Sequence, residues 1–362
     1  MDLRKEIEKR RLPPLLPRAE MKEILQREEY GYLPDTDFLL TAGEPKMIER
    51  RLQRGTVQLT RVPLTIRIGE KEHTFPVERL LHTDGKKRPV VIVNNFNPLS
   101  ASRYIPLEEL SEQDIDFLCV DYRDAASDDG DFTNGLSPLL LPEGQNTDTA
   151  CGKIGVWAWA NMRLADYALT LPGTDPENLA VAGHSRLGKT ALFTAMMDER
   201  FKFVLSNAAG CSGDTLYRGN SGQGRKERTT QKGELICDIV DRFPYWFCKN
   251  YIKYAAANIP ETFDQHFLLA AIAPRYVLVG SCDLDAWADP HSQQLCALAA
   301  GRAWEAQGLP GLSDADTGFL PAGEGRIDGR VGYFNIPSCH FFSRHSWAWL
   351  IRFIELHKEE HP

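Results

Sequence analysis

Short apolar runs alternate with helical patterns over most of the chain from residue 88 onward, and this alternation restricts the possible folds more than any other feature. Five runs have the length and continuous hydrophobicity of strands that are buried on both faces: RPVVIVNNF, IDFLCVDYR, NLAVAGH, FKFVLSNAAG and RYVLVGSC. Helical periodicity is clearest in GVWAWANMRLADYALTL, KTALFTAMMDE and PHSQQLCALAAGRAWEAQG. We therefore predict a three-layer α/β protein built on a mostly parallel, doubly wound sheet.

The segment that precedes this alternation has a different pattern. The runs TVQLTRVPLTIRI and HTFPVERLLHT read as strands, and each contains a proline, Pro63 or Pro76, which cannot donate a hydrogen bond within a sheet. We expect them to form an antiparallel pair at one edge of the sheet. Helical patterns broken by LPPLLP come first, so residues 1–50 are interpreted as an N-terminal helical extension.

The rest of the chain, residues 51–362, is predicted to be one domain with two insertions. The first, at about residues 211–256, begins with a polar, glycine-rich stretch and continues into ELICDIVDRFPYWFCKNYIKY, which indicates an aromatic helix pair or lid. The second, residues 309–330, is rich in Gly, Pro and Asp. Long loops in compact α/β domains are commonly functional.

Composition narrows the classes of partner. The chain has 362 residues, 43% of them hydrophobic, and a formal net charge of -8, which argues against nucleic acid or an anionic membrane as a partner. Its eight cysteines form no CxxC pair, so we expect no metal site, no disulfide framework and no cofactor. The first residues are charged and no run is long enough to cross a bilayer, so the expected location is the cytoplasm. No sequence pattern indicates a particular oligomeric state.

One strand-to-helix junction carries a serine. Ser185 follows LAVAGH and precedes a helical pattern, which places it at the carboxyl end of a predicted parallel strand. Asp285 follows RYVLVGSC and His340 follows GRVGYFNIPSC, so both should reach the same edge of the sheet. A serine nucleophile needs a base and a carboxylate that orients the base, and Ser, Asp, His is the chain order of the α/β-hydrolases. These residues are a candidate catalytic triad.

The serine also has a structural interpretation. Serine is a favoured helix N-cap, and a strand, a turn and a serine do not by themselves distinguish a cap from a nucleophile. The local motif departs from G-x-S-x-G, because Leu187 stands two residues after Ser185 and Gly188 follows one residue later. The later Asp and His loops, in the correct chain order, favour the nucleophile.

The acid and the base of the triad have competitors. Asp283 and Asp289 lie in the same loop as the favoured acid, although Asp289 precedes a proline and so has the pattern of a helix cap. His345 should enter the last helix and point away from the site. His184 and His266 are interpreted as structural histidines.

An acyl-transfer site also needs donors that stabilise an oxyanion. We predict the backbone N–H of Arg186 as the first donor, with its guanidinium in reach of the same position; the alternative for this side chain is an ordinary surface ion pair. The loop NNFNP follows the strand RPVVIV and is predicted to line the opposite side through Asn95, Phe96 or Asn97.

Several separated motifs occur in order along the chain: GKIGVWAWA, GHSRLGK, FPYWFCKNY, FDQHFLLAAIAPR and DAWADP. In this order they resemble the glucuronoyl esterases, and most of all the bacterial relatives that are commonly labelled acetylxylan esterases. The resemblance spans roughly residues 85–355. It implies an α/β-hydrolase that cleaves carboxylic esters on plant cell-wall glycans without a metal.

The resemblance also implies roles for individual residues. In this family the serine stands in G-C-S-R-x-G-K, the arginine helps to hold the oxyanion, and the lysine contacts sugar hydroxyls. Ser185, Arg186 and Lys189 occupy these positions. Trp287 matches an aromatic residue that packs on the sugar ring, and His340 matches the general base.

Two features depart from the family pattern. His184 replaces the usual cysteine before the serine, so the disulfide that many members form between the nucleophile and histidine loops cannot form here. Many members carry their acid after the strand FKFVLSNAAG, where this chain has Ala208 and Ala209. That difference favours Asp285 as the acid.

The sequence therefore predicts a serine esterase that forms an acyl-enzyme on a small-molecule or oligosaccharide ester. Acetyl esters and uronoyl esters are the two leading substrate classes. A serine peptidase, an acyltransferase or a broad carboxylesterase would use the same fold. A noncatalytic glycan-binding relative would keep Trp287 but would not need the triad.

Overall fold

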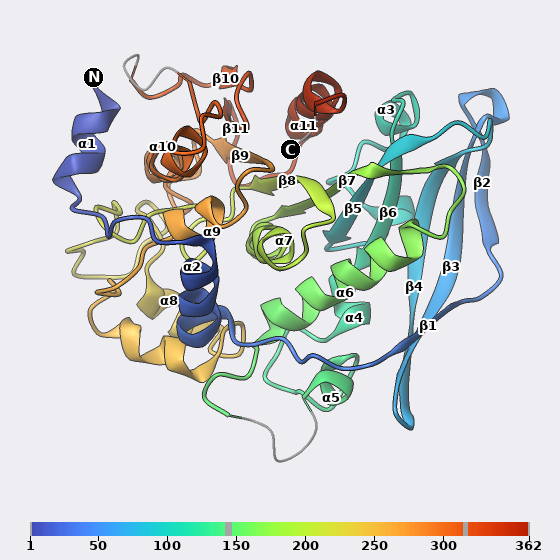
Figure 1. Ribbon diagram of the computed structural model, residues 1–362, viewed down its shortest axis with the longest axis horizontal. Helices are drawn as coiled ribbons and strands as arrows, with labels where there is room; N and C mark the ends of the chain where they lie inside the picture. Colours follow the sequence, from blue (N-terminus) through green and yellow to red (C-terminus); the bar gives the residue numbers. More distant parts are fainter. Residues whose placement is uncertain (1, 142–146, 314–317, 361–362) are drawn as a thin grey trace.

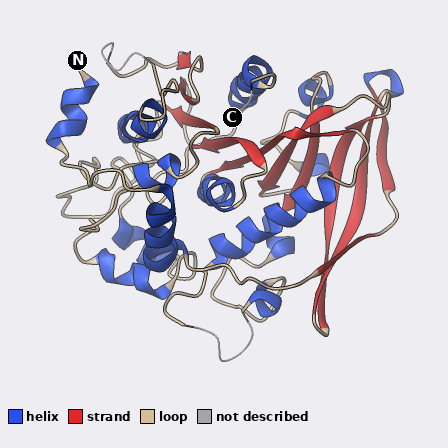
Figure 2. Ribbon diagram, viewed as in Figure 1, coloured by secondary structure: helices blue, strands red, loops and turns tan. Residues whose placement is uncertain are grey.

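A mixed sheet organises the chain, which the computed structural model describes at residues 2–141, 147–313 and 318–360 (Figures 1 and 2). Among these residues the parallel strands are β5 (Arg88–Asn95), β6 (Asp116–Asp121), β7 (Thr174–His184), β8 (Phe201–Asn207), β9 (Tyr276–Cys282) and β11 (Val331–Ile336). The antiparallel strands are β1 (Leu39–Ala42), β2 (Lys46–Leu52), β3 (Val57–Ile68), β4 (Lys71–His82) and β10 (Gly325–Arg326). The strand order is β1-β3-β4-β6-β5-β7-β8-β9-β11-β10, and β2 pairs with β3.

Helices cover both faces of this sheet, which gives the predicted three layers (Figure 1). One face carries α6 (Lys153–Ala168), α7 (Arg186–Met197), α9 (His266–Ala270) and α10 (Pro290–Glu305) over the larger hydrophobic cluster. The other carries α3 (Leu107–Ser111) and α11 (Arg344–His357). The predicted α/β class, with a mostly parallel sheet and an antiparallel N-terminal edge, is confirmed. Among the described residues, no helix is long and apolar enough to cross a membrane.

The remaining helices are short. They are α1 (Leu3–Lys9), α2 (Arg18–Leu25), η1 (Gln26–Tyr30), η2 (Gln53–Gly55), η3 (Leu99–Ala101), α4 (Tyr122–Ala125), α5 (Ser137–Leu140), α8 (Ile236–Arg242) and η4 (Lys249–Ala255). The aromatic segment that the sequence predicts to be a helix pair or lid forms α8 and η4. Residues 314–317 of the second predicted insertion lie outside the described residues.

The antiparallel edge extends further than the sequence predicts. β3 and β4 pair as expected, with Pro63 opposite Pro76, but β1 and β2 add to the far side of β3. The helical interpretation of residues 1–50 is therefore wrong for residues 39–42 and 46–50. Because β2 is exposed along nearly its whole length, it lacks the alternating apolar pattern by which a half-buried strand is recognised.

The helical part of the N-terminal segment packs into the core. Glu29 and Tyr30, at the end of η1, are fully buried. The Glu29 carboxyl accepts hydrogen bonds from Tyr217 Oη (2.8 Å) and Gln265 Nε2 (2.7 Å), and Tyr30 Oη donates to the carbonyl of Ser212 at 2.8 Å. Burial raises the pKa of Glu29 to about 8. The end of η1 therefore packs against the buried chain around Ser212 and stabilises its position.

The raised pKa of Glu29 should make stability depend on pH. Unfolded Glu has a pKa of about 4.3, so the unfolded state loses this proton first and the free energy of unfolding falls as pH rises from about 5 to about 8. We expect Glu29→Gln, which is neutral at every pH, to flatten this fall. Thermal unfolding should give the variant the higher Tm at pH 8, with the difference shrinking or reversing at pH 5.

The neighbouring Glu28 is a matched control. Burial raises its pKa, but hydrogen bonds from Lys253, Arg27 and Tyr254 outweigh burial and hold that pKa at about 2. Glu28 is thus ionised in both states above pH 5, and Glu28→Gln should shift Tm equally at pH 5 and pH 8. A Glu29→Gln protein whose Tm follows the same pH curve as the parent would show that Glu29 is not protonated in the fold.

Candidate active site

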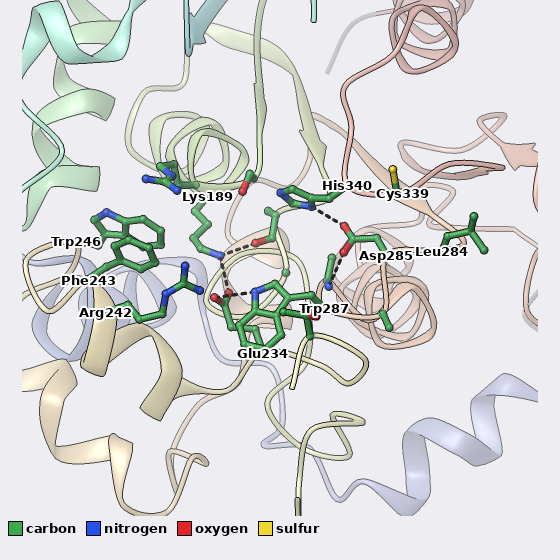
Figure 3. A pocket seen from close by; sticks show the side chains of 18 residues that line it. Lys189, Glu234, Arg242, Phe243, Trp246, Leu284, Asp285, Trp287, Cys339 and His340 are labelled. Carbon is green, nitrogen blue, oxygen red and sulfur yellow. Dashed lines mark hydrogen bonds and ion pairs between the residues drawn. The ribbon is translucent and has the colours of Figure 1, made fainter. Parts of the chain in front are cut away.

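The carboxyl ends of β7, β9 and β11 meet at a pocket of about 400 Å³ (Figure 3). Ser185 follows β7 directly, whereas Asp285 and His340 lie in the loops after β9 and β11. All three line the pocket, together with Arg186, Lys189, Glu234, Arg242, Phe243, Trp246 and Trp287. The sheet topology thus brings together the three residues of the predicted triad.

Ser185 has an unusual backbone conformation. Its φ of 58° and ψ of -126° lie where a residue with a side chain is rarely found. Strain of this kind costs on the order of 1–3 kcal/mol and concentrates at functional sites. Among the described residues, its side chain makes no capping hydrogen bond to α7, so the N-cap interpretation is wrong.

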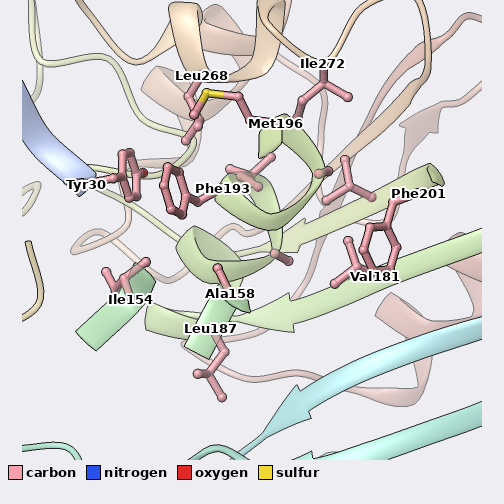
Figure 4. Close-up of a cluster of buried hydrophobic side chains, with 14 of the residues drawn as sticks. Tyr30, Ile154, Ala158, Val181, Leu187, Phe193, Met196, Phe201, Leu268 and Ile272 are labelled. Carbon is pink, nitrogen blue, oxygen red and sulfur yellow. The ribbon is translucent and has the colours of Figure 1, made fainter. Parts of the chain in front are cut away.

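Close packing holds this turn. A Cβ on Gly183 would lie 2.0 Å from the carbonyl oxygen of Leu187, so only glycine allows β7 and α7 to approach this closely. A Cβ on Gly188 would lie 3.0 Å from its nearest neighbour, which explains a glycine at this position although Leu187 replaces the glycine of the common motif. Figure 4 shows apolar side chains around α7, including Tyr30, which stacks on Phe193 with ring centroids 4.4 Å apart.

His340 and Asp285 form a direct pair. Nδ1 of His340 lies 2.6 Å from Oδ2 of Asp285, and the other carboxylate oxygen accepts the backbone N–H of Ala288 at 3.2 Å. Asp285 is 4% exposed, and the His340 side chain is 42% exposed at the pocket. The carboxylate therefore fixes the ring and leaves Nε2 as the nitrogen that can exchange a proton.

The competing acids have structural roles. Asp283 accepts the backbone N–H of Ser338 at 2.9 Å and so ties the acid loop to the histidine loop. Asp289 accepts the backbone N–H of Ser292 at 3.2 Å and caps α10, as the Asp-Pro pattern predicts. Of the three candidates, Asp285 is the one that contacts His340.

The other histidines are placed as the sequence predicts. His345 lies in α11, where it lines a separate groove against α3. Burial, and then the nearby His340, hold the pKa of His184 well below its usual range, and burial lowers the pKa of His266 to about 4. The His184 ring packs with its centroid 4.5 Å from that of the His340 ring, and Cys339 is a free, exposed thiol.

Arg186 forms an ion pair, which is the alternative that the sequence leaves open for its side chain, and its oxyanion role stays a prediction. Its guanidinium forms an ion pair with Asp128, but this pair lies at the pocket, with the guanidinium carbon 4.6 Å from the centre of the Trp246 ring. Nε of Arg186 is buried and has no hydrogen-bond partner among the residues that the structure describes. A buried donor without an acceptor is costly, and at a functional site a ligand often supplies the acceptor.

The loop NNFNP has hydrogen bonds of its own. Asn95 donates to the carbonyl of Asn97 at 2.8 Å and to Ser102 Oγ at 2.9 Å, so its amide hydrogens stabilise the loop itself. These two bonds use both amide hydrogens of the Asn95 side chain, and a contribution of this loop to an oxyanion hole stays a prediction. The centre of the Phe96 ring lies 5.8 Å from the guanidinium carbon of Arg186.

A polar cluster of Lys189, Glu234 and Trp287 lines the same pocket (Figure 3). Lys189 is 2% exposed; its Nζ donates to the carbonyls of Ala209 and Cys211 and lies 3.6 Å from a Glu234 oxygen. Trp287 Nε1 donates to the other Glu234 oxygen at 3.1 Å. Burial raises the pKa of Glu234, and the charge of Lys189 opposes this shift. The sequence identifies Lys189 and Trp287, but Glu234 carries no motif of its own.

Together, the strained serine at a strand-to-helix turn and the carboxyl edge of a doubly wound sheet define an α/β-hydrolase fold, in which Ser185, Asp285 and His340 line one pocket. The family is equally clear. Residues 66–308 match the family model described as glucuronyl esterase, fungi, and the chain belongs to this glucuronoyl esterase family.

Individual relatives agree with this assignment. The chain is 34% identical over 206 residues to carbohydrate esterase MZ0003 from an unknown prokaryotic organism, covering 57% of this chain and 44% of that protein. It is 26% identical over 299 residues to 4-O-methyl-glucuronoyl methylesterase from Hypocrea jecorina (strain QM6a), covering 80% and 57%. The chain thus spans about half the length of these curated relatives.

Solved structures match over nearly the whole fold. A glucuronoyl esterase from Solibacter usitatus superposes with a TM-score of 0.81 at 26% identity, covering 94% of this chain and 91% of that one. A promiscuous CE15 esterase from the marine bacterial metagenome superposes with a TM-score of 0.80 at 25% identity, with the same coverage.

Proposed function

We propose that this protein is a serine carbohydrate esterase that hydrolyses uronoyl esters of plant cell-wall glycans through an acyl-enzyme. The observation that carries the proposal is the 2.6 Å contact between His340 and Asp285 in the pocket that the strained Ser185 also lines. The family assignment and the relatives named as glucuronoyl methylesterases support the uronoyl substrate.

In the proposed mechanism each group has a distinct role. Ser185 Oγ attacks the ester carbonyl while Nε2 of His340 takes its proton, and Asp285 stabilises the resulting imidazolium. The backbone N–H and the guanidinium of Arg186 stabilise the oxyanion. His340 then protonates the departing alcohol, and in the second half-reaction it activates the water that hydrolyses the acyl-enzyme.

The polar cluster around Glu234 favours a sugar on the acyl side of the ester. Lys189 lies one helical turn after the nucleophile, so the cluster sits beside the carbonyl that is attacked. The Glu234 carboxylate can accept hydrogen bonds from sugar hydroxyls, and the Trp287 ring offers an apolar face to the sugar. In a uronoyl ester these contacts hold the reacting carbonyl itself. The direct contact of Lys189 with a sugar stays a prediction.

Loss of Lys189 should impair sugar recognition more than chemistry. In Lys189→Met the buried Glu234 loses its cation, so its carboxyl holds its proton more strongly and accepts hydroxyl hydrogen bonds less well. We expect KM for a glucuronate ester to rise about 10-fold, equivalent to about 1.4 kcal/mol, while kcat/KM for an aryl acetate changes little. Steady-state kinetics on the two substrates measure this.

A second buried lysine provides the control for this variant. Lys202 is buried away from the pocket, where it donates to Asn178 Oδ1 at 3.0 Å and to the carbonyl of Lys358 at 2.8 Å. Lys202→Met should lower Tm without changing KM for either substrate. Equal losses on both substrates in Lys189→Met would show that the lysine supports the fold alone.

Three substrates distinguish the candidate activities. We expect the rate on benzyl glucuronate to exceed the rates on acetylated xylan and on an aryl acetate. Similar rates on all three would instead indicate a broad esterase. This outcome is worth testing because one structural relative is described as promiscuous. Deacetylation alone would overturn the uronoyl assignment but not the serine mechanism.

A further inference from the structure

Asp128 lies in the loop after α4 and forms polar contacts with side chains from three separate parts of the chain. Its carboxylate forms the ion pair with Arg186 and also accepts hydrogen bonds from Tyr122 Oη (2.9 Å) and Trp246 Nε1 (2.8 Å). Its backbone carbonyl accepts a fourth hydrogen bond, from Tyr245 Oη, at 2.9 Å. One residue thus joins the arginine beside the nucleophile to the aromatic segment between α8 and η4.

The loop that carries Asp128 is itself anchored. Lys153, the first residue of α6, is fully buried, and its Nζ donates to the carbonyl of Asp131 and to Ser127 Oγ. Ser127 Oγ in turn donates to Asp129 at 2.6 Å. The Asp128 side chain is 12% exposed. These contacts hold the Asp128 carboxylate in a fixed position, from which it can orient the Arg186 side chain.

An arginine side chain needs a fixed partner of this kind to stay in one rotamer. Its long side chain carries about 2 kcal/mol of rotamer entropy, and a donor stabilises a transition state best when it is in place before charge develops. Asp128 holds one end of the Arg186 guanidinium and also holds the Trp246 indole on which that guanidinium lies. This leaves the buried Nε of Arg186 without a protein acceptor among the described residues.

We propose that Asp128 is a positioning residue: its carboxylate sets the Arg186 guanidinium and the Trp246 indole in one fixed arrangement beside Ser185, so that the cation is preorganised for the oxyanion. This inference rests on the proposed function, in which Arg186 stabilises the oxyanion. It predicts that Asp128 affects catalysis only through Arg186. If the Asp128–Arg186 ion pair only stabilised the fold, Asp128→Asn would lower Tm. Its effect on kcat would then not depend on whether Arg186 is present.

The first test is a double-mutant cycle on benzyl glucuronate. Arg186→Ala should lower kcat by about 10²- to 10³-fold, the range for loss of one oxyanion donor. Asp128→Asn should lower kcat by about 10- to 100-fold with KM within about 3-fold, because the donor remains but is misplaced. In the double variant kcat should fall no more than about 3-fold below that of Arg186→Ala alone, because residues that act as one unit are not additive.

Chemical rescue gives a second, independent readout. In Arg186→Ala the Asp128 carboxylate faces an empty space that free guanidinium fits, so millimolar guanidinium chloride should restore part of kcat. The same salt should restore nothing in the double variant, which lacks the anchor. Asp129→Asn, one residue along the same loop, should leave kcat and rescue unchanged, because the amide oxygen of asparagine can still accept the hydrogen bonds from Ser127 and from the backbone N–H of Asp131, and Asp129 does not contact Arg186 in the described structure.

The outcomes separate this inference from the proposed function. Losses that multiply in the double variant, or an unchanged kcat in Asp128→Asn beside a large loss in Arg186→Ala, would overturn the positioning role and leave the oxyanion role of Arg186 intact. An unchanged kcat in Arg186→Ala would overturn both. Should Asp128→Asn not fold, Asp128→Glu keeps the charge but moves it by one methylene, and normal kcat in that variant would also overturn the proposal.

Discussion

Ser185→Ala should abolish ester hydrolysis, with kcat lowered by about 10⁶-fold, the loss seen when the nucleophile of a serine triad is removed. The fold should survive this change. The Ser185 side chain makes no capping bond to α7 among the described residues, so alanine loses no hydrogen bond of that kind. Alanine also experiences the same strain as serine at a φ of 58°. Tm should therefore change by no more than a few degrees.

Labelling and kinetics together check this assignment. A fluorophosphonate probe should modify the parent protein once, at Ser185, and should not modify Ser185→Ala. Ser338→Ala is the matched control, because Ser338 lies in the histidine loop and contacts Asp283 through its backbone; it should keep both labelling and kcat. Residual activity above a few per cent in a normally folded Ser185→Ala protein would exclude Ser185 as the nucleophile.

The sequence predicts those site residues that lie next to a recognisable pattern of neighbouring residues. A strand that is buried on both faces has a continuous apolar pattern, and the residue after it must lie at the carboxyl edge of a parallel sheet. This reasoning places Ser185, Asp285 and His340 at one edge before any contact is known. Proline after Asp289 likewise identifies a helix cap from two neighbouring residues.

The parts that the sequence does not predict depend on contacts between distant segments. Asp128 is one of several acidic residues in a polar loop, and its role comes from Arg186, which is 58 residues away in the chain. Burial raises the pKa of Glu29, hydrogen bonds from Tyr217 and Gln265 only partly oppose this shift, and no local pattern reveals either effect. Loop residues such as Glu234 depend in the same way on how the chain folds back over the pocket.

Asn95 shows how local hydrogen bonds compete with a predicted role in the site. A strand end near the nucleophile makes its polar side chains candidates for ligand contacts, but the turn that follows also needs donors. The turn takes both amide hydrogens of Asn95 for a carbonyl and a hydroxyl within seven residues. Local hydrogen bonds of this kind compete with function for short polar side chains, and only the structure shows which use prevails.

The acid of the triad is tested by three substitutions in one loop. Asp285→Asn should lower kcat by about 10⁴-fold, the effect of replacing the orienting carboxylate by an amide. The amide can donate to Nδ1 of His340, which moves the ring proton to Nε2 and leaves no acceptor for the proton of Ser185. Substrate binding does not involve this contact, so KM should change far less than kcat.

Asp283→Asn and Asp289→Asn are the matched controls for this test, because each makes the same change of charge close to Asp285. The asparagine oxygen can still accept the backbone N–H of Ser338 or of Ser292, and Asn caps a helix about as well as Asp. Both variants should therefore keep kcat within about 10-fold of the parent. A loss of about 10⁴-fold in Asp283→Asn, with Asp285→Asn nearly normal, would show that the acid is the other carboxylate of this loop and that the His340–Asp285 contact does not orient the base.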